Sequence, residues 1–116
     1  MTKKFLDLCR EKIVIFDGAM GTSIQACPLS IDDFQGKEGC NEILVETKPE
    51  IIKEIHASFL KVGCDVIETN SFGSSSIVLN EYDIADESYN LNFLSAKIAR
   101  ETANDFSKLK PRFVAG

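Results

Sequence analysis

An acidic residue and two glycines close the first long apolar run of the chain, and these residue types suit ligand binding. Asp17 follows four apolar residues, 13–16, and precedes Gly18 and Gly21. An unbroken apolar run predicts a strand buried on both faces, as in a parallel sheet. Parallel α/β proteins carry their chemistry at the carboxyl ends of strands, and glycines let backbone turn tightly or approach a ligand. The alternative is that Asp17 only caps a turn made by the glycines.

A second group of polar residues lies in the stretch 65–70, which we interpret as the next strand. Side chains alternate across a strand, so Glu68 and Asn70 share one face and Ile67 and Thr69 share the other. A glutamate and an asparagine on one face suit the inner wall of a barrel near its mouth, where they can meet a ligand. We expect Ile67 and Thr69 to face the helices. The alternative is an exposed edge strand whose polar face is solvated.

Two other kinds of chemistry fit the first motif poorly. A phosphatase that uses a strand-end aspartate as its nucleophile typically needs a second acid two residues later, and Ala19 stands there. The glycines do not complete a GxGxxG pattern, and the chain contains no GxxxxGK[ST] motif, which argues against a nucleotide site.

The residues that most often bind transition metals are scattered along the chain. No two cysteines form a CxxC pair, and His56 is the only histidine. His56 lies beside the apolar stripe of an expected helix, away from any strand end, so we interpret it as a packing residue. Reduced and mostly buried thiols are the simplest interpretation of the cysteines, and we assign no metal ligand. The cysteines are Cys9, Cys27, Cys40 and Cys64.

The elements that must position these residues can be read in chain order. Residues 3–11 predict a short helix that leads into a strand at 12–17. Residues 18–46 form a long loop after that strand, and such a loop is usually either functional or disordered. We expect it to be ordered because it contains apolar anchors, namely Phe34, Ile43, Leu44 and Val45.

The next helix has a clear start and end in the sequence. Thr47 and Glu50 have the spacing of a capping box, with Thr47 as N-cap and Pro49 in the first turn. Gly63 stands where a helix ends in a left-handed residue. Between these limits one apolar stripe recurs at helical spacing: Ile51, Ile52, Ile55, Phe59 and Leu60.

The last third of the chain predicts two helices and a strand. Residues 74–83 indicate a short helix or turn, and 86–106 a longer helix with Asp86 as its N-cap. Small residues in the longer helix permit close packing on a sheet. Residues 112–116 begin like a third buried strand, which gives the order βαβαβ. An open doubly wound sheet and a (β/α)₈ barrel both begin in this way, and a barrel needs about 250 residues.

Composition limits the partners of the protein. The chain has 116 residues, 44% of them hydrophobic, as is usual for one globular unit. A net charge of −5 argues against nucleic acid or an anionic membrane as a partner. No apolar run is long enough for a membrane span or a signal-peptide core, so we expect a cytoplasmic location.

Several motifs together resemble one enzyme family. FDGAMGT (16–22), GCNEIL (39–44), the whole run 47–73 and KPRFVAG (110–116) are similar to the homocysteine-binding barrel of cobalamin-dependent methionine synthases. The stretch 89–105 also favours that branch. The wider homocysteine S-methyltransferase family, which includes betaine–homocysteine methyltransferases, shares the first-strand and second-strand motifs more loosely.

The resemblance implies a fold and a reaction. The fold is a (β/α)₈ TIM barrel, of which residues 1–116 would be the N-terminal, incomplete portion: two and a half βα units. In this family a zinc ion held by three cysteine thiolates lowers the pKa of the homocysteine sulfur, and the thiolate attacks a methyl group to make methionine. The donor would be methylcobalamin or 5-methyltetrahydrofolate, held by neighbouring cobalamin- and folate-binding domains. Betaine or S-methylmethionine is the alternative donor.

The resemblance also assigns residues. A carboxylate aimed at the ammonium group of homocysteine would account for Asp17. Asn41 and Glu42 match a family loop motif, and no role follows for them from chemistry. None of the four cysteines stands at a zinc-binding position of the family, so we assign no catalytic and no metal-binding residue. The expected substrate-binding residues are Asp17, Gly18, Glu68, Thr69, Asn70 and Phe72.

Two expectations concern the chain by itself. It should bind neither zinc nor cobalamin and should not transfer methyl groups, because a zinc site needs thiolates that converge. It should self-associate or be partly disordered, because a barrel cut after two and a half units leaves strand edges unpaired and an apolar wall uncovered. A non-catalytic barrel fragment is therefore the alternative to an enzyme.

Overall fold

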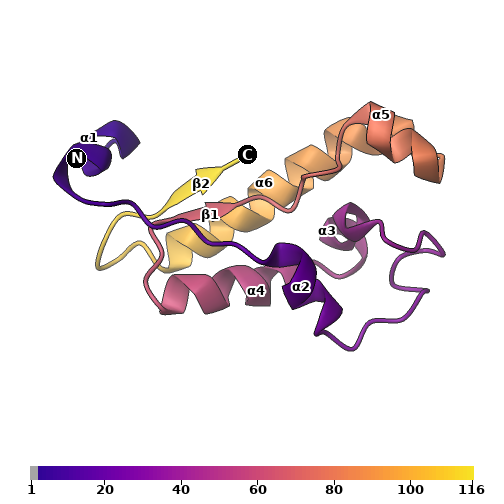
Figure 1. The fold of residues 1–116 in the computed structure, drawn as a ribbon, viewed down its shortest axis with the longest axis horizontal. Coiled ribbons are helices and arrows are strands. Elements are labelled where there is room, and N and C mark those ends of the chain that lie inside the picture. Colours follow the sequence, from indigo (N-terminus) through magenta and orange to yellow (C-terminus); the bar gives the residue numbers. More distant parts are fainter. Residues whose placement is uncertain (1–2) are drawn as a thin grey trace.

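The computed structural model describes residues 3–116 and shows an α/β fold built on a short parallel sheet (Figure 1). Strands β1 (Val66–Glu68) and β2 (Phe113–Ala115) pair in parallel. No helix in this described range is long and apolar enough to cross a bilayer. The helices are α1 (Phe5–Glu11), α2 (Met20–Gln25), α3 (Leu44–Thr47), α4 (Pro49–Lys61), α5 (Ser76–Leu79) and α6 (Ser88–Asp105). Short 3₁₀ helices are η1 (Asn41–Ile43), η2 (Asn80–Tyr82) and η3 (Ala85–Glu87).

The strand predicted at 12–17 is present only as a single bridge, and this prediction was wrong in extent. Phe16 bridges Val66 in parallel, on the side of β1 away from β2. The Val66 amide donates to the Ile15 carbonyl at 3.1 Å, and the Asp17 amide donates to the Val66 carbonyl at 3.0 Å. The segment 13–17 therefore runs beside β1 but is not a full strand. The strand predicted at 65–70 is likewise shorter, since β1 ends at Glu68.

The segment 13–17 is also far less buried than its apolar sequence predicts. Ile13 is 82% exposed, Ile15 52% and Phe16 44%. The physical reason is that β1 is its only strand neighbour in the described chain, so its other edge meets solvent.

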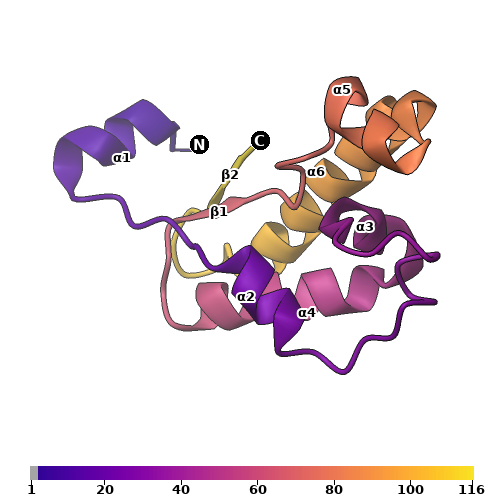
Figure 2. The same cartoon turned by 45° about the vertical axis from the view of Figure 1, so that its right-hand side comes forward.

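Helices α4 and α6 pack against each other and against one face of the sheet (Figure 2). Ile67 points to this side and is fully buried, as the strand alternation predicted. Ala99 and Ala103 of α6 are also fully buried, and their small side chains let the helix approach the sheet closely, as expected. Leu60 of α4 and Cys64 belong to the same cluster.

Helix α1 covers the amino-terminal part of the opposite face. Phe16, Val66 and Phe113 are cross-strand partners, so their side chains share one face, and Ile67 lies on the other. The ring of Phe5 stands edge-on to those of Phe16 and Phe113, with centroids 6.4 and 5.5 Å away. The helix predicted at 3–11 is therefore confirmed as α1.

The predicted start of α4 was wrong in its capping residue. The helix begins at Pro49, its N-cap is Lys48, and no side chain caps it. Thr47 instead ends α3, and its hydroxyl donates to the Asp33 carbonyl at 2.6 Å. The predicted end is confirmed, because Gly63 follows the helix with φ of +106°.

His56 of α4 is fully buried, which confirms its interpretation as a packing residue. Neither of its ring nitrogens has a hydrogen-bond partner within residues 3–116. Burial lowers the pKa of His56 to about 4, so the ring is neutral at physiological pH.

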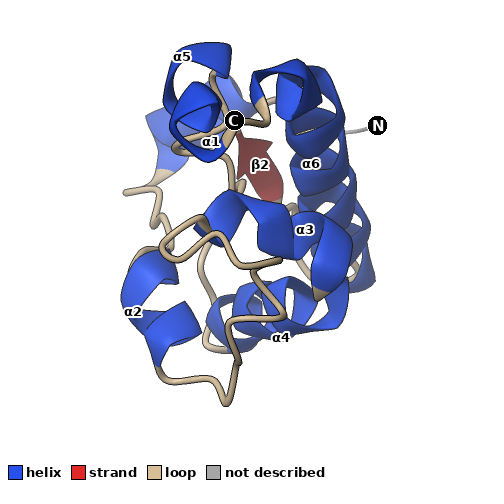
Figure 3. Ribbon diagram, turned by 90° about the vertical axis from the view of Figure 1, so that its right-hand side faces the viewer, coloured by secondary structure: helices blue, strands red, loops and turns tan. Residues whose placement is uncertain are grey.

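The long loop 18–46 is ordered, as its apolar anchors predicted. Ile43, Leu44 and Val45 are almost fully buried, and Phe34 packs against the same cluster. The loop contains α2, η1 and most of α3. Figure 3, which looks toward the carboxyl ends of the strands, shows α2, α3 and α5 gathered around that end. The loop thus places its residues beside the strand ends.

Two 3₁₀ turns precede α6, and the predicted N-cap of this helix was wrong. Asp86 is exposed and lies inside η3, which continues directly into α6 with Glu87 at the N-cap position. Helix α5 has a true side-chain cap, because the Ser75 hydroxyl accepts from the Val78 amide at 3.2 Å.

Candidate functional site

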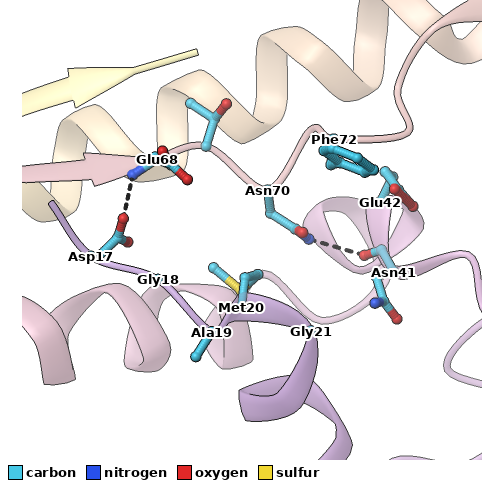
Figure 4. Close-up of a pocket in the computed structure, with 11 residues that line it drawn as sticks. Asp17, Gly18, Ala19, Met20, Gly21, Asn41, Glu42, Glu68, Asn70 and Phe72 are labelled. Carbon is cyan, nitrogen blue, oxygen red and sulfur yellow. Dashed lines mark hydrogen bonds between the residues drawn. The ribbon is translucent and has the colours of Figure 1, made fainter.

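A pocket of about 300 Å³ lies at the carboxyl end of β1, between that strand, the segment after residue 16 and the loop before α3 (Figure 4). All six residues predicted to bind substrate line it, although they come from two distant parts of the sequence. The lining residues are Asp17, Gly18, Ala19, Met20, Gly21, Asn41, Glu42, Glu68, Thr69, Asn70 and Phe72.

Asp17 is held in place by the backbone of β1. Its Oδ1 accepts from the Glu68 amide at 2.9 Å, as Figure 4 shows, and the side chain is half-buried. Burial raises the pKa of Asp17, and the nearby Glu68 carboxylate raises it further, while the hydrogen bond from the Glu68 amide lowers it. The net effect is that the pKa of Asp17 lies above its ordinary value. A cation bound beside this carboxylate would be attracted by the negative charges of both Asp17 and Glu68.

Glu68 and Thr69 both line the pocket. Glu68 is exposed and lies on the face opposite Ile67, as predicted. The expected orientation of the Thr69 side chain, toward the helices, stays a prediction, and the Thr69 amide continues the pairing with β2 by donating to the Ala115 carbonyl at 2.9 Å.

Asn70 is a buried member of the lining, with 6% of its surface exposed. Its side-chain amide donates to the backbone carbonyl of Asn41 at 3.0 Å (Figure 4). Asn70 thus has a structural partner inside the site. Phe72 is fully exposed at the rim of the same pocket.

Asn41 and Glu42, which carried no role in the sequence analysis, belong to the site. They start η1, and the Glu42 Oε1 accepts from the Gly73 amide at 2.8 Å. The GCNEIL motif was the available signal, but only the fold shows that residues 31 positions apart meet. Ala19 and Met20 were missed as well, because nothing in their side chains indicates binding, and Gly21 was noted only as a glycine that could turn or approach a ligand.

The turn after Asp17 depends on Ala19 and not on the glycines. Ala19 has φ of +55° and ψ of +30°, a left-handed conformation that costs a non-glycine residue on the order of 1 kcal/mol. Gly18 and Gly21 have no positive φ, and a Cβ at either would meet no atom within 4 Å. Both glycines line the pocket.

The family relationship can be stated at this point. Residues 14–116 match the family model for homocysteine S-methyltransferase. The chain belongs to this family. It is 44% identical over 112 residues to the methionine synthase of Mycobacterium tuberculosis and 42% identical over 102 residues to that of Mycobacterium leprae. These alignments cover 96% and 88% of the chain but 9% and 8% of the relatives, so the chain spans less than a tenth of their length.

Solved structures give the same fold. The crystal structure of the homocysteine methyltransferase MmuM from Escherichia coli, in its oxidized form, superposes with a TM-score of 0.72 and 25% identity. The crystal structure of its metallated form superposes with a TM-score of 0.74 and 21% sequence identity. The similarity covers 94% and 95% of this chain and 38% and 39% of the two MmuM chains. The chain therefore has the α/β architecture of part of a homocysteine methyltransferase.

The zinc ion implied by the family does not fit the described residues. No group of three or more histidine, cysteine, aspartate or glutamate side chains within residues 3–116 could hold a metal ion. Cys40 and Cys64 are buried, burial raises the pKa of both thiols, and Cys9 is exposed. These residues form no zinc site together.

Proposed function

We propose that this chain forms the amino-acid-binding side of the active site in a methyltransferase that transfers a methyl group to the sulfur of homocysteine, which yields methionine. The segment 13–17, β1 and β2 would then be the first three strands of a (β/α)₈ barrel, with residues 1–116 as its N-terminal portion. The family and the match of the fold to MmuM support this proposal.

The observation that carries the proposal is the placement of Asp17. Its Oδ1 is fixed on the Glu68 amide, and the two carboxylates line one pocket of about 300 Å³. That volume is at the lower end for ligand pockets and suits a small amino acid. The ammonium group of homocysteine would complement the two negative charges, so Asp17 would orient the substrate while its sulfur reacts elsewhere.

We propose methylcobalamin, recharged from 5-methyltetrahydrofolate, as the donor, because the curated relatives are methionine synthases. Cobalamin- and folate-binding domains would then be partners of this unit, and zinc would be held by residues outside it. Betaine and S-methylmethionine are the competing donors. Assays with each donor in turn, using the complete polypeptide, distinguish these cases: transfer from methylcobalamin alone supports the proposal.

Asp17→Asn in the complete polypeptide tests the proposed function. Loss of a charge-assisted contact should raise the KM for homocysteine roughly 10- to 100-fold, with bound zinc unchanged. Asp32→Asn, at an exposed position of the 18–46 loop, is the matched control and should leave KM unaltered. Loss of zinc with unchanged homocysteine affinity would refute the role of Asp17. Absence of methyl transfer to homocysteine by the unmodified protein would refute the function itself.

A further inference from the structure

The segment 69–73, which we call the rim loop, forms one wall of the pocket but has little regular structure of its own. It contributes Thr69, Asn70 and Phe72 to the lining. Its backbone is tied to β2 only at its first residue, where the Thr69 amide donates to the Ala115 carbonyl at 2.9 Å. Beyond that point its path depends on a hydrogen bond within the loop, from the Ser71 amide to the Thr69 carbonyl at 2.9 Å, and on contacts with other parts of the chain.

Two such contacts come from adjacent residues of η1. The Asn41 carbonyl accepts from the Asn70 side chain at 3.0 Å, and the Glu42 Oε1 accepts from the Gly73 amide at 2.8 Å. The first bond holds the beginning of the rim loop and the second holds its end. Together they form a clamp, which we define as Asn41 and Glu42 with their two partners.

The residues that flank Asn41 and Glu42 are anchored in the apolar core. Cys40, immediately before it, is fully buried, and Ile43 and Leu44, immediately after it, are 3% and 0% exposed. All three belong to the largest apolar cluster of the described chain. Side chains in a close-packed core resist displacement, so Asn41 and Glu42 are fixed points against which the rim loop is held.

Gly73 lies directly against the carboxylate of Glu42. A Cβ built at Gly73 would lie 2.5 Å from the Glu42 Oε1 and 3.1 Å from its Cδ, so the Glu42 carboxylate would have to move to admit it. Gly73 is buried and has no positive φ, so backbone conformation is not what requires glycine here. The Glu42 carboxylate occupies the space that a side chain would need.

We infer that Glu42 is a positioning residue for homocysteine: by holding the Gly73 amide it fixes the rim loop in the conformation that builds the pocket wall. Its Oε1 is engaged by backbone, so Glu42 acts through the loop and not as a catalytic residue. The inference rests on the proposed function. It predicts a defect in substrate binding with little change in the chemical step.

The first test compares Glu42→Ala with Glu42→Gln in the complete polypeptide. Alanine removes the acceptor, so the KM for homocysteine should rise roughly 10- to 100-fold while kcat stays within about threefold. Glutamine keeps a carbonyl oxygen at the same position, so its KM should stay within about threefold of the unmodified value. Glu46→Ala, four residues later at an exposed position of α3, is the matched control and should change neither constant.

The second test is a double-mutant cycle between Glu42 and Gly73. Gly73→Ala should raise KM like Glu42→Ala, since its methyl group displaces the carboxylate. The double variant should be no worse than either single variant, because both remove the same hydrogen bond. Additive effects on KM would overturn the inference.

Hydrogen exchange in the unmodified protein gives a measurement that does not depend on the folding of any variant. The Gly73 amide should exchange slowly despite lying in a loop, and fast exchange would overturn the clamp. Normal KM in a folded Glu42→Ala protein would also overturn it while leaving the proposed function intact. Absence of homocysteine methylation by the unmodified protein would instead refute the proposed function.

Discussion

The carboxylate of Asp65 meets the ammonium group of Lys12 at 3.0 Å, although 53 residues separate them in the sequence. The same carboxylate accepts from the Lys110 ammonium at 3.2 Å and from the Ile15 amide at 2.9 Å. Asp65 is 1% exposed. One buried side chain thus joins the segment before the sheet, the start of β1 and the loop that leads to β2.

Asp65 should control stability in acid. Burial raises its pKa, but the Ile15 amide and the two lysines outweigh this effect and bring the pKa to about 2, below the ordinary 3.8. The stabilisation is therefore complete above pH 3.8 and is lost as the pH falls toward 2. Asp65→Asn should lower the free energy of unfolding by about 2 kcal/mol at pH 7. Urea unfolding at pH 7 and pH 2 measures this.

The exposed Asp86 provides the control for that experiment, since Asp86→Asn should leave the urea midpoint unchanged. A difference between Asp65→Asn and the unmodified protein that stayed constant down to pH 2 would contradict the electrostatic explanation.

His56 should control stability in a separate and less acidic window. Its folded pKa of about 4 lies below the ordinary 6.5, so the unfolded chain binds a proton that the folded chain rejects. Stability should fall by about 3 kcal/mol as the pH drops from 6.5 to 4. His56→Leu should abolish this slope, because a buried ring without hydrogen-bond partners is replaced by an apolar group. Equal slopes for both proteins in pH-dependent urea unfolding would show that another group titrates there.

The isolated chain should self-associate through its open sheet edge. Ile13 and Ile15 are 82% and 52% exposed beside unpaired backbone, an arrangement that favours pairing with a second chain. Light scattering at rising concentration should detect species larger than the 12.8 kDa monomer, and Ile15→Lys should reduce them. Val62→Lys, at an 84% exposed position just after α4, is the control and should not. A monomer at high concentration would contradict this prediction.

Local sequence patterns predicted the presence of helices and strands better than the residues at which they begin and end. The apolar stripe of α4 and the left-handed Gly63 depend on neighbours within a few residues, and both are confirmed. The prediction of Thr47 as N-cap was wrong because its hydroxyl donates to the carbonyl of Asp33. Asp33 is fourteen residues away, and no local sequence pattern reveals this contact. The prediction that the segment 13–17 is buried was wrong for a similar reason, because burial depends on neighbouring strands that only the fold shows.

The candidate site could be predicted where it follows strand alternation and family motifs. Glu68 and Ile67 lie within β1 and take the faces that a period of two assigns them. Thr69 lies one residue beyond the strand and lines the same pocket. The GCNEIL motif marked Asn41 and Glu42, but their contacts are hydrogen bonds that span about thirty residues, so the sequence alone did not show what they do.

The Phe5 ring lies against Phe16 and Phe113 at the amino-terminal part of the sheet face, whereas the pocket lies at the carboxyl end of β1. Under the proposed function, an amino acid seated with its charged end against Asp17 would therefore lie past this aromatic cluster. A methyl donor would then have to reach it from the carboxyl side of the strands.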